Sequence, residues 1–274
     1  MSAPVTIIRP KKTFSVADLR ELWSYRELLY FFTWRDFKVR YKQTLIGAAW
    51  AILQPFVTMV VFSVFFGKLA QVPSDGVPYP IFVYVGLLFW QFFSGALSDT
   101  SNVLVGNQAI ITKVYFPRLI LPVSGILTKF VDFVFAAIIL AGLMFYYGFV
   151  PHIEGLWLIP LLLVITFAAS VGAGLILASM NVKYRDVRYA LPFFIQILLF
   201  ITPVIYPASI AGSWSWLLAL NPMTGVIQSA RAALLGTTVL NWNLLGISSA
   251  ACLVLLFIGV VYFKKVERYF ADIL

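Results

Sequence analysis

The sequence predicts an all-α integral membrane protein, and three features of it support that fold class. They are long runs almost without charge, the length of those runs, and the placement of the basic residues. The uncharged runs occupy 43–67, 76–98, 133–153, 155–182, 189–230 and 232–263. Each contains or exceeds the roughly 20 residues that a helix needs to cross a bilayer core of about 30 Å. Because backbone amides find no water there, we expect helices that satisfy their own hydrogen bonds.

Composition agrees with this fold class. Hydrophobic residues make up 61% of the 274 positions and charged residues 11%, against about 25% charged residues in an ordinary soluble domain. The lone cysteine, Cys252, cannot form an intrachain disulfide and is interpreted as a small buried hydrophobe. The lone histidine, His152, has no Cys, Asp or second His close in the sequence, which disfavours a metal site there.

The basic residues predict the orientation. Eighteen of the 20 Lys and Arg residues fall on one set of connections, and only Lys68 and Arg231 fall on the other. Short basic loops stay cytoplasmic, so we expect both termini inside. No apolar signal core precedes residue 43, so no cleaved secretory peptide is expected.

The fifth run is too long for one crossing. Its 42 residues would span about 63 Å as a single helix. Two crossings there would place the basic tail 264–274 outside, so we expect one span followed by a non-crossing, re-entrant or interfacial segment at 207–241 on the outer side. The resulting prediction is a single domain, 43–263, with six spans at approximately 43–67, 79–98, 120–148, 156–180, 190–206 and 244–263.

The N-terminal segment 1–42 is expected to end in an amphipathic helical region over 14–42. The side chains of Leu22, Tyr25, Leu29 and Phe32 recur at helical spacing and so share one face. A second aromatic stripe of Trp34, Phe37 and Tyr41 is followed one residue later by a basic stripe of Arg35, Lys38 and Lys42. Such a helix lies in the membrane plane beside anionic headgroups. Its basic residues either fix the orientation of the chain in the membrane or bind a lipid that carries a pyrophosphate.

The connection 106–122 is unusually apolar for a short cytoplasmic loop, with Lys113 and Arg118 flanking the apolar stretch. Either a soluble partner covers it, as exposed apolar patches suggest, or it lies on lipid as an interfacial helix. Close to it in the chain, Lys129 and Asp132 are three residues apart near the inner end of the third span, where they are expected to pair on one helix face.

Motifs of catalysis and nucleotide binding are missing from the sequence. It contains no GxxxxGK[ST] phosphate loop, no HExxH and no GxSxG. An ATP-hydrolysing or hydrolytic role for this chain is therefore not expected. The small residues between Ala168 and Gly174 are interpreted as a surface that lets helices approach closely.

Aromatic residues within the spans could face a common interior, because sugar rings present C–H faces that lie flat on aromatic rings. Alternatively, these rings simply meet lipid or other helices. The candidates are Phe62, Phe65, Phe66, Trp90, Phe93, Phe193, Phe194 and Phe200.

Four stretches resemble a known family: the run WRDFKVRYKQTLIGAAWAILQPFVTMVVFSVFFG at 34–67, LVGNQAIITKVYFPRLILPVS at 104–124, NVKYRDVRYALPFFIQILLFITPVIYP at 181–207 and LNPMTGVIQSAR at 220–231. They resemble the permease subunit of bacterial ABC transporters that export O-antigen and related polysaccharides, the type-2 exporters. The likeness runs from about residue 20 to the end. Ile46, where the family usually has Leu, is a mild departure.

The resemblance implies a homodimer in the bacterial inner membrane, paired with two copies of a separate ATPase that carries ATP and Mg²⁺. It implies no cofactor on this chain and no nucleic-acid partner. The segment 106–118 would dock on the ATPase, with candidate contacts Lys113, Tyr115, Phe116 and Arg118. The interface-helix motif near an inner gate and the lipid headgroups would comprise Trp34, Arg35, Asp36, Lys38, Arg40 and Tyr41.

The function expected from the sequence is therefore the export of a lipid-linked polysaccharide, with O-antigen, capsule and teichoic acid sharing these motifs. Two alternatives stay open at this stage. One is a permease of the same architecture that exports a small amphiphile or drug. The other is a membrane-embedded transferase acting on lipid-linked sugars, against which the lack of a clustered acid–base set speaks.

Overall fold

The computed structural model describes residues 16–42, 47, 49–150, 153–236 and 239–270. These residues form helices joined by turns and short loops, with no strand among them. Five helices are long and apolar enough to cross a membrane, and together they confirm a multi-pass, all-helical membrane protein. They are α3 (Ala49–Phe62) continuing into the π-helix η1 (Ser63–Leu69), α4 (Tyr79–Gly106), α6 (Ile120–Tyr147), α8 (Leu158–Lys183) and α12 (Trp242–Glu267).

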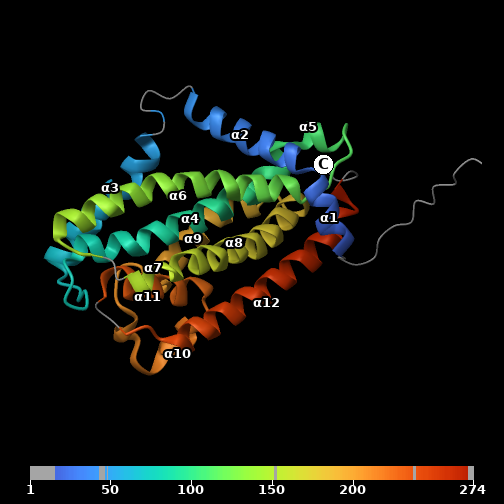
Figure 1. Cartoon of the computed structure of the whole chain (residues 1–274). Helices are drawn as coiled ribbons and strands as arrows, with labels where there is room; N and C mark the ends of the chain where they lie inside the picture. The colour runs from blue at the N-terminus through green and yellow to red at the C-terminus, as the bar shows by residue number, and fades with distance from the viewer. Residues whose placement is uncertain (1–15, 43–46, 48, 151–152, 237–238, 271–274) are drawn as a thin grey trace, which may run out of the picture.

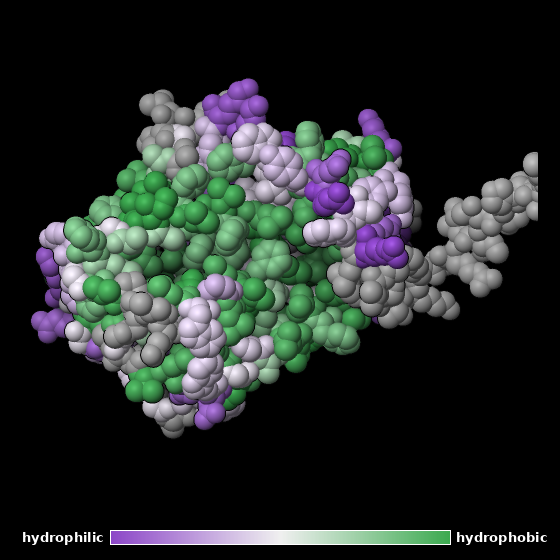
Figure 2. All heavy atoms as spheres, in the orientation of Figure 1, coloured by the Kyte–Doolittle hydropathy of each residue, from purple (hydrophilic) through white to green (hydrophobic). Residues whose placement is uncertain are grey.

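The long helices run side by side in one bundle, and the short helices gather at its two ends (Figure 1). We call the end that carries α1 (Val16–Ser24), α2 (Arg26–Lys42) and the last turn of α12 the inner end, and the opposite end the outer end. Figure 2 shows apolar residues over the middle of the visible face and hydrophilic ones toward the ends. This distribution matches a bilayer core bounded by two polar layers.

α4 is the central helix of the bundle. Its outer half is almost fully buried, and in particular the residues from Ile81 to Val85 have almost no exposed surface. It packs against α3, α6, α8 and α11 (Pro222–Leu235). α4 also continues to Gly106, eight residues beyond the predicted end of the second span, because its apolar surface at Val103 and Leu104 packs into a second core at the inner end.

Close approach of α8 and α12 depends on glycine, as the small-residue surface at 168–174 predicts. A Cβ atom on Gly172 would lie 2.7 Å from the Cα of Leu256, and one on Gly259 would lie 2.2 Å from the carbonyl oxygen of Gly172. Real Cβ atoms do not come this close to backbone, so only glycine fits. A Cβ atom on Gly174 would meet the side chain of Thr100 at 2.8 Å, which brings α4 against the same helix.

The predicted fifth span, 190–206, is helical only in α9 (Val187–Ile201). Its 15 residues measure about 22 Å as a helix, shorter than a bilayer core. The helix ends at Ile201 because Thr202 precedes Pro203, and a residue before proline is pushed into the extended region. Thr202 is extended accordingly, with φ −76° and ψ 136°.

In the part of the predicted outer segment 207–241 that the structure describes, there are three short helices. They are η2 (Ala208–Trp214), α10 (Ser215–Ala219) and α11. The side chain of Asn221 caps α11 by accepting a hydrogen bond from the Met223 amide at 3.0 Å. α11 is buried against α4, α8 and α12, with α7 (Ile153–Leu156) beside it.

At the inner end, α1, α2 and α5 (Gln108–Ile111) surround a separate hydrophobic core. The stripe predicted from Leu22, Tyr25, Leu29 and Phe32 is confirmed, since Phe32 is buried in this core and the other three pack against it. Phe263 and Phe270 bring the end of α12 into the same core. α1 and α2 are therefore packed onto the bundle through this stripe.

Candidate functional site

Five charged and polar side chains converge where α2 crosses the inner halves of α4 and α6. We call Arg40, Tyr41, Asp99, Lys129 and Asp132 the ion-pair cluster. Arg40 donates from Nη1 to Asp132 Oδ2 at 2.7 Å and from Nη2 to Asp99. Tyr41 donates its phenolic hydrogen to the other oxygen of Asp132. Lys129 Nζ lies 3.6 Å from Asp99 Oδ2 and 3.5 Å from Asp132 Oδ2.

The cluster joins three helices with two cations and two carboxylates. All four charged side chains are half-buried, so water screens their attraction less than it would on an open surface. Burial, together with the hydrogen bond to Asp132, raises the pKa of the Tyr41 phenol, which therefore stays protonated and donates at neutral pH. The arrangement holds α2 against the spans.

The sequence predicts only part of this cluster. It predicts the pair Lys129–Asp132, which the structure confirms, and assigns Arg40 and Tyr41 to a gate motif without giving them partners. Asp99 was not among the predicted site residues. The one signal available for it is that ionisable residues at the ends of spans are rare and usually paired.

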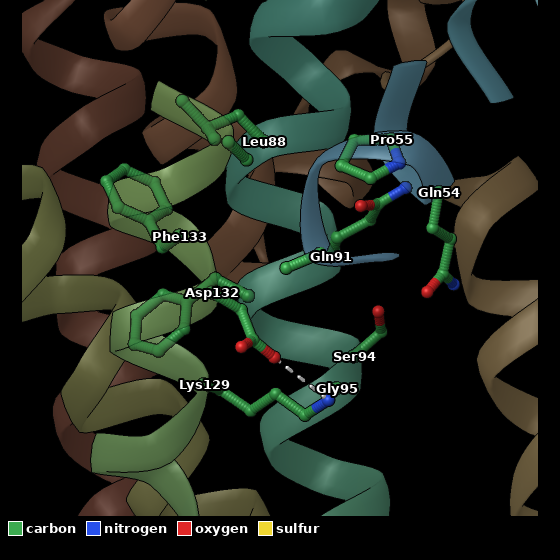
Figure 3. Close-up of a pocket in the computed structure, with 12 residues that line it drawn as sticks. Gln54, Pro55, Leu88, Gln91, Ser94, Gly95, Lys129, Asp132 and Phe133 are labelled. Atoms are coloured by element: carbon green, nitrogen blue, oxygen red, sulfur yellow. Dashed lines mark ion pairs between the residues drawn. The ribbon is translucent and has the colours of Figure 1, made fainter. Parts of the chain in front are cut away.

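A small cavity of about 120 Å³ lies beside the cluster, between α3, α4 and α6. Figure 3 shows Lys129 and Asp132 at one side of it, with Gln54, Gln91 and Ser94 facing the same space from α3 and α4. Gly95 leaves room for the lysine, because a Cβ atom there would lie 3.0 Å from its Cδ and Cε atoms. Amide and hydroxyl groups next to the Lys129–Asp132 ion pair suit a neutral, hydroxyl-bearing group at the inner side of the bundle.

Of the other residues of the interface-helix motif, Arg35 contacts the connection 106–118. Arg35 donates from Nη2 to Asn107 Oδ1 at 2.9 Å and also pairs with Asp36. Its guanidinium lies 4.8 Å from the Phe32 ring centroid. Trp34 is exposed, and its ring centroid lies 5.8 Å from that of Phe37. Lys38 is also exposed.

The four candidate contacts of the docking segment differ in their surroundings. Tyr115 is 81% exposed, with its hydroxyl 3.4 Å from Glu21 Oε1, and Lys113 is exposed beside it. Phe116 is 4% exposed and packs against Phe32 with ring centroids 5.8 Å apart. Arg118 donates to the carbonyl of Glu267 and lies 5.8 Å from the Phe270 ring centroid. The first two side chains are open to a partner, whereas the last two hold the segment to the rest of the inner end.

Three of the eight span aromatics line one groove. Trp90, Phe93 and Phe194 belong to an apolar groove of about 630 Å³ between α4, α8, α9 and α12. Phe62 and Phe66 instead contact each other on the first span, with centroids 5.6 Å apart, and Phe65 is exposed there. Phe193 and Phe200 are exposed on α9. Within one copy of the chain, the eight rings do not meet in one place.

Arg231, one of the two basic residues predicted on the outer side, is buried on α11 with 2% of its surface exposed. It donates to the carbonyls of Phe82, Pro203 and Val204 at 3.2, 2.9 and 2.6 Å. Its guanidinium also lies 3.6 Å from the Phe82 ring centroid. The carbonyls of Pro203 and Val204 follow the end of α9 and have no helical partners, so the arginine supplies their hydrogen-bond donors, whereas Phe82 belongs to the first turn of α4. Sequence alone gave no reason to pair these residues.

The fold and the site define a class of protein: a multi-pass helical membrane protein whose inner-end helices are tied to its spans by ion pairs. Residues 27–235 match the family model of the ABC-2 type transporter. The chain belongs to this family. Among the described residues, no three His, Cys, Asp or Glu side chains come together as metal ligands would.

Several curated proteins are similar to the chain along almost its entire length. The O-antigen export system permease protein RfbA of Myxococcus xanthus is 30% identical over 260 residues, which cover 93% of this chain and 98% of the relative. The protein of the same name from Klebsiella pneumoniae is 28% identical over 249 residues, covering 90% and 95%. The polysialic acid transport protein KpsM of Escherichia coli is 24% identical over 240 residues, covering 85% and 91%.

Proposed function

We propose that this chain is the permease subunit of an ATP-driven ABC transporter that exports a lipid-linked polysaccharide across the bacterial inner membrane. The observation that carries the proposal is the near end-to-end match to relatives named for O-antigen export and polysialic acid transport. The lack of a phosphate loop fits a subunit whose partner hydrolyses ATP.

The proposed assembly is a homodimer with two copies of a soluble ATPase, which carries the ATP and Mg²⁺. Exposed apolar surface on the short helix α9, including Phe193, Phe194 and Phe200, supports an unoccupied helix-packing face on each protomer. Six crossings per protomer follow if α9 and the residues after it complete the fifth span, since Arg231 and Tyr79 of the same chain pair with carbonyls that leave the helix. The cationic inner end then lies in the cytoplasm with both termini.

The proposed coupling begins at the segment 106–118. Tyr115 and Lys113 are the open side chains there, and Phe116 and Arg118 connect the segment to α2 and α12. Movement of the segment on ATP binding would therefore shift α2, which the ion-pair cluster ties to α4 and α6. We assign the cluster and its cavity to the inner gate, where the cavity's amides and hydroxyl would meet sugar hydroxyls of the lipid-linked substrate.

The test is deletion of the gene with plasmid complementation. Surface polysaccharide should disappear from the deletion strain while lipid-linked polymer accumulates in the cytoplasm, and the wild-type gene should restore export. Unchanged surface glycan without accumulation contradicts the proposal. The control is the same strain lacking the partner ATPase gene, which should show the same defect.

Export of a small amphiphile is a second candidate, and one observation favours it: the apolar groove that contains Trp90, Phe93 and Phe194. Apolar compounds would stimulate the ATPase activity of the purified complex in that case, and surface glycan would be unaffected by the deletion. If only lipid-linked glycan stimulates the ATPase activity of the complex, the result supports polysaccharide export.

A further inference from the structure

We infer that an outer-end pocket between α10, α11 and α12 binds an uncharged sugar ring of the exported glycan. The inference rests on the proposed function for its source of ligand and adds a binding site to it. The pocket has a volume of about 460 Å³, inside the range of about 300–1,000 Å³ typical of small-molecule sites. It lies at the end of the molecule opposite the ion-pair cluster.

Two buried polar atoms in this pocket have no hydrogen-bond partner among the described residues. They are the hydroxyl oxygen of Thr224, whose residue is 0% exposed, and the side-chain nitrogen Nε2 of Gln228. The two residues are four positions apart on α11, so they share one helix face, and both line the pocket. Leaving a buried donor or acceptor unpaired costs free energy, and a ligand hydroxyl, which both donates and accepts, would remove that cost.

The remaining lining matches a neutral polyol better than an ion or an acyl chain. It combines the amides and hydroxyls of Asn241, Asn243 and Ser215 with the Trp216 ring and apolar side chains such as Val239, Leu244 and Ile247, and it contains no Asp, Glu, Lys or Arg. The apolar groove of Trp90, by contrast, is lined almost entirely by apolar side chains. An anionic ligand would find no counter-charge in the outer pocket, and an acyl chain would leave its polar groups unpaired.

Trp216 supplies a stacking surface for such a ring. Its side chain is 62% exposed while it lines the pocket, so its flat face is open to a ligand. A tryptophan at this depth is also expected as a membrane-interface residue. The unpaired Thr224 and Gln228 beside it distinguish the pocket from a simple interfacial anchor, since an anchor has no need of buried amides.

The experiment is saturation-transfer NMR on the complex of permease and ATPase in nanodiscs. The probes are the methyl pyranosides of glucose, galactose and mannose, with methyl glucuronide as the anionic comparator, each at millimolar concentration. At least one neutral pyranoside should give a saturable signal and the glucuronide none. Absence of a signal from all three neutral sugars, or an equal signal from the glucuronide, overturns the inference.

Substitutions assign the signal to the pocket. Gln228→Leu should weaken binding about tenfold, equivalent to about 1.4 kcal/mol, and Trp216→Ala should weaken it without affecting folding, because the ring is largely exposed. The matched control is Thr128→Val, a buried threonine outside the pocket whose hydroxyl already donates to Ser124 O at 2.9 Å. Equal binding by wild type, Gln228→Leu and Trp216→Ala overturns the site.

A second measurement, the melting temperature of the ligand-free complex, keeps the inference testable where a variant folds poorly. Thr224→Val removes an unpaired buried hydroxyl, so the melting temperature of the ligand-free complex should stay the same or rise. Failure of the pocket is separable from failure of the proposed function. A wild-type gene that restores surface glycan, with no pyranoside binding to its product, contradicts the pocket alone, whereas unchanged glycan in the deletion strain contradicts the function.

Discussion

Arg40 on α2 and Asp132 on α6 are 92 positions apart in the chain, yet their side chains form a direct ion pair with 2.7 Å between Nη1 and Oδ2. Because Asp99 of α4 accepts from the other nitrogen of the same guanidinium, one arginine connects three helices. The interface helix is therefore held by directed ion pairs as well as by its apolar face. This makes the position of α2 sensitive to single substitutions in the cluster.

Asp132→Asn should loosen α2. The asparagine keeps the shape of the side chain but removes one of two negative charges that face Arg40 and Lys129. Hydrogen bonds to charged groups contribute about 1.5–3 kcal/mol, so the melting temperature of the purified complex should fall by several degrees. Export should fall in the complemented deletion strain.

A double-mutant cycle with Arg40→Met isolates the pair. If Arg40 pairs with Asp132 and Asp99, the variant carrying both Arg40→Met and Asp132→Asn should lose less stability than the two single variants lose together. The difference should be about 0.5–3 kcal/mol of unfolding free energy. Lys38→Gln, at an exposed lysine on the same helix, is the control and should leave stability unchanged. Additive losses in the cycle contradict a direct interaction.

Gly259→Ala should separate α8 from α12. The new Cβ atom would fall 2.2 Å from the carbonyl oxygen of Gly172, and overpacking of this kind costs about 1–3 kcal/mol. Gly142→Ala is the matched control, since nothing lies within 4 Å of a Cβ atom there. That variant should be neutral or stabilised by up to about 1 kcal/mol, because alanine is the better helix former. Thermal melting of both variants checks the pair, and equal melting temperatures would mean that the two helices are not in close contact.

Much of the fold follows from hydropathy and charge. The predicted third span, 120–148, matches α6 (Ile120–Tyr147) almost residue for residue, because Pro117 precedes the helix, an uncharged apolar run begins at residue 133, and Gly148 ends the helix in the left-handed conformation. The amphipathic stripe on α1 and α2 is equally local, since four residues at helical spacing define a face. Such features depend on neighbours in the chain, which a sequence displays directly.

The site depends on contacts between distant segments, and there the sequence gives less. Nothing in the local pattern around Arg40 indicates that its partners are Asp99 and Asp132, because charge pairing across helices is set by their packing. Phe116 resembles a docking residue by its apolar, basic surroundings, yet the structure buries it under Phe32. The end of α9 is determined locally by Pro203, whereas the donor to the freed carbonyls is Arg231, which is distant in the chain.

Arg231→Met should destabilise the outer end. It leaves the carbonyls of Pro203 and Val204 buried without their donor, and each unpaired group costs about 1–3 kcal/mol. Hydrogen exchange should therefore increase at the amides of η2 and of the residues just before it, and the complex should melt several degrees lower. Lys68→Met removes the other basic residue of the outer side, which is exposed, and should change neither property. Unchanged exchange in the Arg231 variant would show that the extended stretch after α9 is held by something else.

Tyr115→Ala and Phe116→Ala should separate docking from folding. Tyr115 is exposed, so its truncation should change the melting temperature of the permease little. If Tyr115 touches the ATPase, this variant should weaken assembly of the complex by about tenfold, as loss of a contact aromatic often does. Phe116 is buried against Phe32, and its truncation should cost about 3–5 kcal/mol of stability whether or not the ATPase is present. Melting of the permease alone and titration with the purified ATPase measure the two effects. A Tyr115 variant that binds the ATPase normally would move the docking surface away from this segment, and a stable Phe116 variant would mean that the inner core does not depend on that ring.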